Sequence, residues 1–259
     1  MQVSVIIPTF NEAEILGATL QQLSLLRPAP EIVVADGGSG DDTPAIARAA
    51  GARVVSCPRR GRAFQMNDGA RAAAGDVFLF LHADLELSQK AWDALLKTLA
   101  DPSLAGGAFR RFFRSSSLLL RIGAHLAALR SSLCGLSFGD QAIFARREVF
   151  ERLHGFPEIL LFEDLEFSRA LRRAGRTVLI REPILASSRR FEKEGAARRL
   201  LGNLVLTARY LLGQDPNALA RLYHPESFAE TPLRPLEEQT PDADATQAMY
   251  PLPPGEGQG

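Results

Sequence analysis

Residues 31–40 read EIVVADGGSG, and this stretch decides the fold class. Its first part, Glu31–Ala35, is a short β-branched and apolar run of the kind that forms a buried strand. An aspartate and two glycines follow at once, and these residues favour a turn. The same pattern of an apolar run with an abrupt end recurs in the first hundred residues, at Val3–Ile7, Arg53–Ser56 and Val77–Leu81.

Segments with the apolar spacing of helices lie between these runs. We expect them to begin after Asn11 as an N-cap, to continue at Thr43–Ala50 and Ala63–Ala74, and to begin again after Ser88. Apolar strands that alternate with helices predict an α/β fold, with a mostly parallel central sheet and helices on both faces. Ligands bind such sheets beyond the carboxyl ends of the strands. We therefore expect the polar residues at 8–12, 36–39 and 82–84 to form one site.

The second half of the chain is less regular. We expect strands at Gly106–Phe113, Gln141–Ala145, Thr177–Ile180 and Ile184–Ser187, and helices at Leu118–Leu129, Glu163–Ala174 and Glu194–Leu212. Beyond Pro225 the composition changes to Pro, Glu, Asp, Thr and Gly. Such a composition cannot supply an apolar core, and it predicts a disordered tail.

Charge argues against nucleic acid as a partner, because 30 basic and 30 acidic residues balance over the 259-residue chain. Residues 107–202 hold 18 basic and 10 acidic residues. This surplus would suit a phosphate-bearing ligand, although solvated helix faces explain most of it.

The two cysteines, Cys57 and Cys134, are far apart and form neither a disulfide framework nor a zinc motif. With no signal-peptide pattern at the N-terminus, they favour a cytoplasmic protein. No run of 18 apolar residues is present, so we expect no transmembrane segment. The apolar helix at Leu200–Leu212 is compatible with peripheral contact with a membrane, and equally with packing against the first lobe or a second subunit.

A phosphate-bearing ligand would need a metal ion here, because the sequence contains neither the GxGxxG nor the Walker lysine motif. His82-Ala83-Asp84 follows an apolar run, so Asp84 is expected at a strand tip. One or two carboxylates plus substrate phosphates are the usual ligands of Mg²⁺, and Glu86 is near enough to add another. The alternative is a structural role for His82 and Asp84 at the start of a loop.

Other polar segments are open to two interpretations. Glu163-Asp164 begins an amphipathic helix, where the dipole favours acids as caps, but a carboxylate there could also act as general base for an acceptor hydroxyl. Asp36 either caps an ordinary turn or accepts hydrogen bonds from a base or ribose, and Gly37 would let a ligand approach the backbone. Gly139-Asp140-Gln141 is ambiguous by itself.

Together, these segments resemble the family 2 glycosyltransferases in order and approximate spacing. The resemblance rests on VIIPTFNE at 5–12, DGGS at 36–39, the Asp84 tripeptide and Glu163-Asp164, and it covers residues 2–225. The segment GRAFQMNDGA at 61–70, with His82-Ala83-Asp84, looks like a bacterial subgroup associated with radical-SAM and selenium-domain proteins.

The resemblance implies a GT-A fold, a nucleoside-diphosphate sugar as donor, Mg²⁺ or Mn²⁺, and direct displacement with inversion at the anomeric carbon. By position, Asp36 would contact the base, Asp84 would bind the metal on the diphosphate, and Asp164 would be the catalytic base beside Glu163. The other residues implied at the substrate site are Pro8, Asn11, Glu12, Gly37, Arg62, Gln65, Asn67, Asp140 and Gln141. Residues 1–100 would then bind the nucleotide sugar and 101–225 the acceptor, leaving 226–259 as the tail.

The departure from the family lies in the metal motif, commonly Asp-x-Asp, where His82 replaces the first acid. Imidazole is a softer ligand than carboxylate, so Mn²⁺ is expected to be tolerated better than in most members. Two alternatives stay open. A sugar nucleotidyltransferase would typically carry a glycine-rich basic loop after the first strand, which is absent here, and a non-catalytic protein with the same fold would bind the nucleotide sugar only.

Overall fold

The computed structural model describes residues 1–113, 115, 117, 120, 122–125, 137–187 and 196–223, without the side chains of 196–200 and 223. All described elements belong to one compact unit, Met1–Phe228. The predicted tail at 226–259 and most of the predicted helix at Leu118–Leu129 lie outside the described residues.

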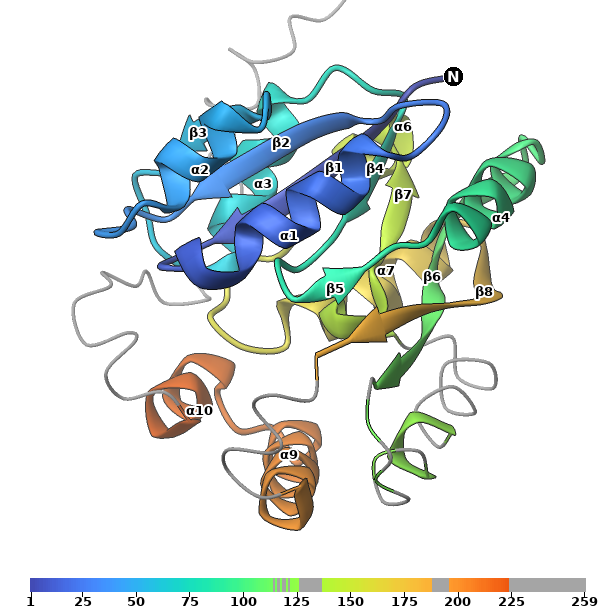
Figure 1. The fold of residues 1–259 in the computed structure, drawn as a ribbon. Helices are drawn as coiled ribbons and strands as arrows, with labels where there is room; N and C mark the ends of the chain where they lie inside the picture. The colour runs from blue at the N-terminus through green and yellow to red at the C-terminus, as the bar shows by residue number, and fades with distance from the viewer. Residues whose placement is uncertain are drawn as a thin grey trace, which may run out of the picture. The chain divides into compact units, whose positions relative to one another are not determined.

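The elements of this unit are labelled in Figure 1. In chain order they are β1 (Val3–Thr9), α1 (Ala13–Ser24), β2 (Glu31–Asp36), α2 (Thr43–Ala49), β3 (Arg53–Ser56), α3 (Arg62–Ala72), β4 (Val77–Phe80), β5 (Leu85–Glu86), α4 (Gln89–Leu99), β6 (Leu104–Phe113), the 3₁₀ helix η1 (Gly139–Gln141), β7 (Phe144–Arg146), α6 (Arg147–Arg152), α7 (Glu163–Ala174), β8 (Arg176–Ala186), α9 (Ala196–Leu211) and α10 (Pro216–Tyr223).

One eight-stranded sheet, in the order β3-β2-β1-β4-β7-β6-β8-β5, runs through the unit. The first four strands in this order are parallel, and β6 is parallel to β8. The pairs β4–β7, β6–β7 and β5–β8 are antiparallel. The mostly parallel α/β sheet expected from the sequence is therefore confirmed, with β7 as the reversed strand that joins its two halves.

The second half differs from expectation at two points. The strands expected at Thr177–Ile180 and Ile184–Ser187 are one strand, β8, because a bulge opposite Phe109–Arg111 of β6 accommodates the intervening residues and their proline. The strand expected at Gln141–Ala145 was placed too early, since residues 139–141 form η1 and β7 begins only at Phe144.

Two of the expected helix ends follow capping chemistry. Ser88 caps α4 by accepting the Ala91 N–H, and Gly51 adopts the expected left-handed conformation after α2. The expected N-cap at Asn11 is wrong. Asn11 itself is left-handed, with φ 52°, and the carbonyl of Glu12 accepts the first hydrogen bonds of α1.

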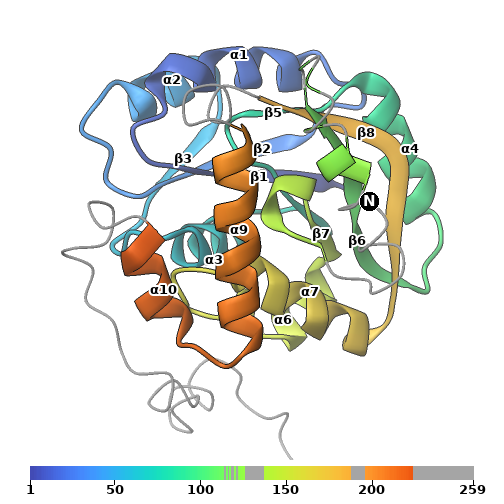
Figure 2. The same ribbon diagram turned by 90° about the horizontal axis from the view of Figure 1, so that it is seen from below.

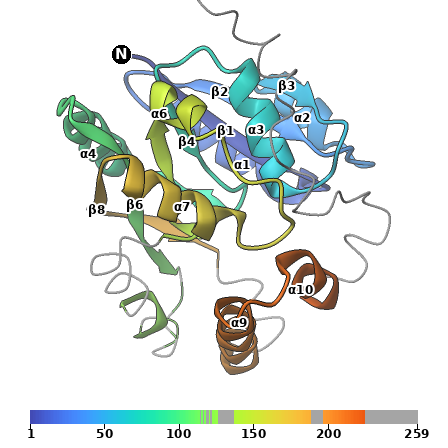
Figure 3. The same cartoon turned by 180° about the vertical axis from the view of Figure 1, so that it is seen from behind.

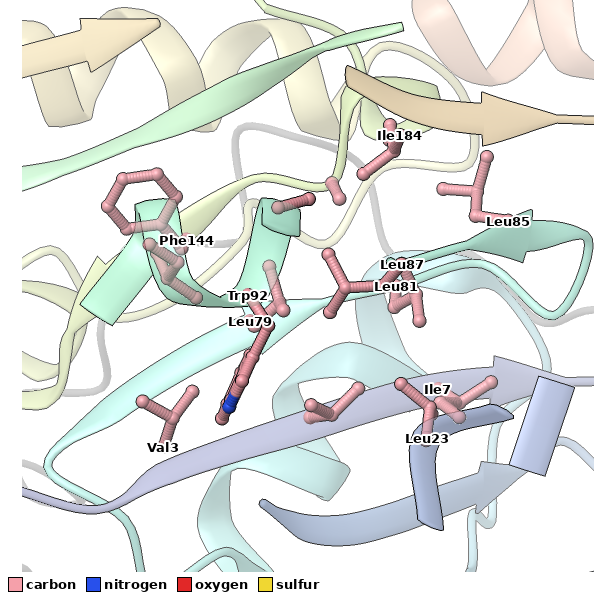
Figure 4. Packing of buried hydrophobic residues seen from close by; sticks show 14 of the residues in the cluster. Val3, Ile7, Leu23, Leu79, Leu81, Leu85, Leu87, Trp92, Phe144 and Ile184 are labelled. Atoms are coloured by element: carbon pink, nitrogen blue, oxygen red, sulfur yellow. The ribbon is translucent and has the colours of Figure 1, made fainter. Parts of the chain in front are cut away.

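Each face of the sheet carries its own apolar core. On one face, side chains of α1 and α4 pack on β1 and β4 around the buried Trp92, as Figure 4 shows. On the other face, α3, α6 and α7 cover the same strands, and Figure 3 views the unit from that side. Five phenylalanines form edge-to-face contacts there, Phe78, Phe80, Phe150, Phe156 and Phe167.

The two last helices are fastened to the beginning of α7. Phe162 and Leu165 pack with Leu219 of α10, and with Leu206 and Tyr210 of α9. Figure 2 shows α9 nearest the viewer, beside α10. Among the described residues, no helix is both long and apolar enough to cross a membrane.

The glycines of β6 generate a prediction about stability. A Cβ on Gly107 would overlap the Val178 carbonyl oxygen and lie 2.9 Å from the Phe144 ring, so Gly107→Ala should lower the free energy of unfolding by about 3 kcal/mol. A Cβ on Gly202 of α9 would meet nothing within 4 Å. Gly202→Ala is therefore the control and should leave stability equal or raise it by up to about 1 kcal/mol. Urea unfolding measures both, and equal losses would contradict the packing of β6.

Candidate active site

The sheet brings the polar strand ends to one edge, as expected. Thr9 of β1 is in register with Asp36 of β2, and the Gly37 N–H donates to the Thr9 carbonyl at 2.9 Å. At the end of β4, the Leu81 N–H donates to the carbonyl of Ile6 at 2.9 Å. The turns that follow β1, β2 and β4 therefore begin side by side.

Asp36 shapes its own turn. Its Oδ2 accepts the backbone N–H groups of Gly38 (3.1 Å) and Ser39 (2.9 Å), and its Oδ1 accepts the hydroxyls of Ser39 (2.5 Å) and Thr9 (3.3 Å). These four bonds occupy the acceptor sites of a carboxylate. The side chain is buried, so the capping interpretation of Asp36 accounts for its contacts within the protein.

The turn after β1 is tied to the turn after β2. The Asn11 N–H donates to Ser39 Oγ at 2.9 Å, and the Asn11 side-chain oxygen accepts the Gly40 N–H at 2.9 Å. The Glu12 N–H donates to Thr43 Oγ1 at 2.8 Å. Pro8, half-buried, pairs with Ala35 in the parallel ladder. These contacts hold Pro8, Asn11 and Glu12 in one rigid wall.

Gln65 and Asn67 face the interior rather than the site. Gln65 is buried, and its amide group donates to the carbonyls of Thr9 (2.6 Å) and Ala35 (3.0 Å). Asn67, also buried, exchanges two 2.8 Å hydrogen bonds with the backbone of Phe156. Both amides thus bind protein backbone, and their expected place on the donor side of the site stays a prediction.

A stacked pair that the sequence reasoning missed lies beside the wall. The Arg60 guanidinium sits 3.4 Å from the centroid of the Phe10 ring, which is a cation–π contact. Phe10 belongs to the turn after β1, and Arg60 immediately precedes the glycine at the start of α3. The basic run at residues 59–62 was the available signal.

Asp84 offers an uncommitted carboxylate. The backbone of its turn is fixed, because Thr19 Oγ1 donates to the Ala83 carbonyl at 2.6 Å and the Ser187 N–H donates to the Asp84 carbonyl at 3.2 Å. The half-buried Asp84 carboxylate makes no hydrogen bond or ion pair with any described residue. Glu86 lies in β5, where it pairs with Leu185, and its side chain is engaged elsewhere.

Asp164 is connected to the end of β4 through Gly139. The Gly139 N–H donates to Asp164 Oδ2 at 2.6 Å, and the Leu165 N–H donates to Oδ1 at 2.6 Å. A Cβ on Gly139 would lie 2.8 Å from His82 Nε2 and 3.2 Å from Asp164 Oδ2. His82 and Asp164 therefore flank the same glycine, which has no room for a side chain.

Glu163 is a buried acid beside Asp164. It is 1% exposed, its Oε1 pairs with Arg62 Nε at 3.0 Å, and its Oε2 has no hydrogen-bond partner among the described residues. Burial raises the pKa of Glu163 to about 7, Arg62 opposes this rise, and the charge of Asp164 adds to it. The preceding Phe162 is left-handed, with φ 67°, a conformation that bulky residues rarely adopt.

The residues of η1 separate into two roles. Gln141 is buried and closes its own turn, accepting the Phe138 N–H at 3.1 Å and donating to the Phe109 carbonyl at 3.3 Å. Asp140, half-exposed, forms an ion pair with the largely buried Arg111 of β6. Asp140 therefore faces the region beside Gly139, whereas Gln141 supports it.

The site meets the requirements of a hard cation only in part. Among the described residues, no group of three or more His, Cys, Asp or Glu side chains is arranged to hold a metal ion. Mg²⁺ and Mn²⁺ at diphosphates need only one or two protein carboxylates, because phosphate oxygens and water complete the shell. The uncommitted carboxylate of Asp84 fits that donor set.

This architecture is the GT-A glycosyltransferase fold. A mannosyltransferase from Pyrobaculum calidifontis, in complex with GDP-Man and Mn²⁺, superposes with a TM-score of 0.59 over 96% of this chain and 81% of that chain, at 22% identity. Glucosyl-3-phosphoglycerate synthase from Mycobacterium tuberculosis, in complex with Mn²⁺, UDP and glucosyl-3-phosphoglycerate, gives a TM-score of 0.53 over 79% and 78% of the two chains, at 25% identity.

The chain belongs to glycosyl transferase family 2, whose model matches residues 4–153. Among curated proteins, the 4,4'-diaponeurosporenoate glycosyltransferase of Staphylococcus haemolyticus is 32% identical over 112 residues, which are 40% of this chain and 30% of that protein. The alignments with four such relatives cover at most 31% of each relative's length.

The raised pKa of Glu163 predicts a pH dependence of stability. The folded protein keeps the Glu163 proton up to about pH 7, whereas the unfolded chain releases it near 4.5, so folding binds a proton between these values. The contribution of Glu163 is fully present below 4.5 and is lost as the pH rises through 7. Glu163→Gln should therefore gain stability over the natural protein as the pH rises, by roughly 3 kcal/mol between pH 4.5 and 7.5.

Urea unfolding across this pH range measures the effect. Glu151→Gln, which removes an exposed carboxylate, is the control and should leave the pH dependence unchanged. Parallel pH profiles for Glu163→Gln and the natural protein would show that folding does not raise the pKa of Glu163.

Proposed function

We propose that this protein transfers a sugar from a nucleoside-diphosphate sugar to an acceptor hydroxyl, with inversion at the anomeric carbon. The observation that carries the proposal is the juxtaposition at Gly139. The buried carboxylate of Asp164 and the imidazole of His82, which stands two residues before Asp84 in the turn after β4, flank this one glycine. The candidate base for the acceptor therefore lies beside the turn that carries the candidate ligand of the metal on the donor's diphosphate.

The donor would lie along the edge formed by the turns after β1 and β2. Residues 8–12 and 36–40 are fixed to one another by Asn11 and Ser39, so a rigid wall is ready before the nucleotide binds. Gly37 and Asp36 supply backbone close to the ligand, and Arg62, 43% exposed at its side chain, can reach a phosphate. Family 2 membership and the nucleotides in the related structures support this assignment.

Asp84 would hold Mn²⁺ or Mg²⁺, with His82 as the second candidate ligand. The ion, when bound, would offset the negative charge that develops on the leaving diphosphate. The Mn²⁺ in the complexes of both structural neighbours supports a divalent cation. His82 and Glu86 each have another contact in this structure, which leaves Asp84 as the strongest of the three candidates.

Asp164 would act as the general base. Each of its oxygens accepts one backbone N–H, and each keeps a lone pair for the acceptor. The acceptor hydroxyl gives its proton to Asp164 while its oxygen bonds to the anomeric carbon. The bond from that carbon to the diphosphate oxygen breaks on the opposite face, which inverts the configuration. Glu163, with its raised pKa and its partner Arg62, would limit the negative charge next to Asp164.

Three further assignments complete the proposal. Residues 1–100 form the nucleotide-sugar half and residues 101–225 the acceptor half. The segment at 61–70 supports membership in the bacterial subgroup associated with radical-SAM and selenium-domain proteins. The cysteine usage, with Cys57 a buried free thiol, supports a reducing cytoplasm as the site of action.

Donor binding tests the role of Asp84. UDP and GDP should bind more tightly in the presence of Mn²⁺ than in EDTA, and Asp84→Asn should abolish that difference because the ion loses its protein ligand. Isothermal titration calorimetry measures both conditions. Asp93→Asn, on the exposed face of α4, should retain the metal effect. Equal affinities with Mn²⁺ and EDTA in the natural protein would exclude the proposed hold on the diphosphate.

Turnover separates the two acids of α7. Asp164→Asn should keep donor affinity and lose about 10²- to 10⁴-fold in the rate of transfer, the range of general-base catalysis. Glu163→Gln should lose less. Single-turnover transfer from radiolabelled donor, with affinity measured in parallel, gives both values once an acceptor is found. A larger loss of transfer rate for Glu163→Gln than for Asp164→Asn would indicate that Glu163, and not Asp164, is the general base.

A further inference from the structure

The outer face of α9 carries a row of exposed aliphatic side chains. Leu204 is 65% exposed and Leu212 84% exposed, which is unusual for leucines of a folded protein. The row consists of Leu201, Leu204, Val205, Ala208, Leu211 and Leu212, all exposed, and we call it the apolar stripe. Its spacing of three, four, seven, ten and eleven residues places all members on one side of an α-helix.

The opposite face of α9 fixes the helix to the protein. The Tyr210 ring stacks on Phe162, with centroids 4.4 Å apart and planes at 16°, and its hydroxyl donates to Glu166 Oε1 at 2.6 Å. Leu206 packs against the same cluster. Because these contacts use the inward face, they determine that the apolar stripe points away from α7.

Positive charge borders the apolar stripe. Residues 196–223 contain four arginines and one acid, Asp215. The carboxylate of Asp215 is used at the start of α10, where it accepts the N–H groups of Asn217 and Ala218. Arg209 lies next to the stripe on the helix, and position 198 lies three turns earlier on the same side. The surface is therefore aliphatic in the middle, with Arg209 at one edge.

Neither insertion of α9 across a membrane nor pairing with a second copy of the chain fits this surface well. At 16 residues α9 is about 24 Å long, shorter than the roughly 30 Å of a bilayer's hydrocarbon core, so it would lie on a membrane rather than span it. A second copy of the chain would place arginines of both copies along one contact, and like charges oppose such pairing. An anionic lipid surface satisfies both the apolar stripe and the arginines.

We propose that α9 docks this protein on the surface of a membrane that contains anionic lipids. The leucines and the valine of the stripe enter the boundary between headgroups and acyl chains, and Arg209 contacts lipid phosphates. Leu222 of α10 is also exposed, at 64%. The proposal rests on the α9–α10 surface alone and does not depend on the proposed transfer reaction.

Sedimentation with vesicles tests the docking. The full chain should bind vesicles of phosphatidylcholine mixed with phosphatidylglycerol and bind vesicles of phosphatidylcholine alone more weakly, and high salt should reduce the difference. Leu204→Glu with Leu212→Glu should lower the partition coefficient at least about tenfold, since two leucines no longer leave water. Arg209→Gln should lower it about fivefold on the mixed vesicles only.

Leu25→Glu is the matched control, because Leu25 is 68% exposed but lies at the end of α1. It should sediment like the natural protein, and UDP affinity should be the same in all of these variants. Absence of binding to mixed vesicles would overturn the proposal. So would a dimer in light scattering that Leu204→Glu with Leu212→Glu converts to a monomer, since a second copy would then cover the stripe.

Discussion

The carboxamide of Gln65 is the constraint on which the nucleotide half depends. It sits where β1 and β2 separate and donates to a carbonyl at the end of each, Thr9 and Ala35. Without this carboxamide each carbonyl would lose one donor, and the Thr9 carbonyl would keep the Gly37 N–H. The net contribution of one such hydrogen bond to stability is about 0.5–1.5 kcal/mol. A Cβ on residue 37 would lie 2.9 Å from this carboxamide, so a glycine is required there. The directions in which both turns leave the sheet follow from this one side chain of α3.

The polar groups of the site are of two kinds. The side chains of Asp36, Asn11 and Gln65 form hydrogen bonds within the protein, and these bonds tie the turns after β1 and β2 together. Asp84 and Oε2 of Glu163 have no partner among the described residues. In a preorganised site, side chains that are already hydrogen-bonded hold a few polar groups in place, and the ligand supplies the missing partners of those groups. The arrangement around Asp84 and Glu163 is of this kind.

The sequence predicted the first half of the fold well, because buried parallel strands are apolar along their whole length and their ends are visible as turns. It also predicted which turns meet, since the edge of a parallel sheet is a topological property. It predicted poorly where local pattern and tertiary contact disagree. The proline in β8 suggested two strands, yet a bulge against β6 keeps one. The sequence also does not distinguish an asparagine that binds a ligand from one that, like Asn67, binds the backbone of Phe156.

The edges of the sheet have a consequence for the behaviour of the protein at high concentration. One edge strand, β5, has two residues, and the other, β3, has four, of which Arg53 and Ser56 are exposed. Short and polar edges are poor templates for strand pairing between molecules. The buried apolar strands β1, β2 and β4 lie inside the sheet, with neighbours on both sides. As long as the sheet stays folded, these apolar strands are therefore not available to pair with strands of other chains.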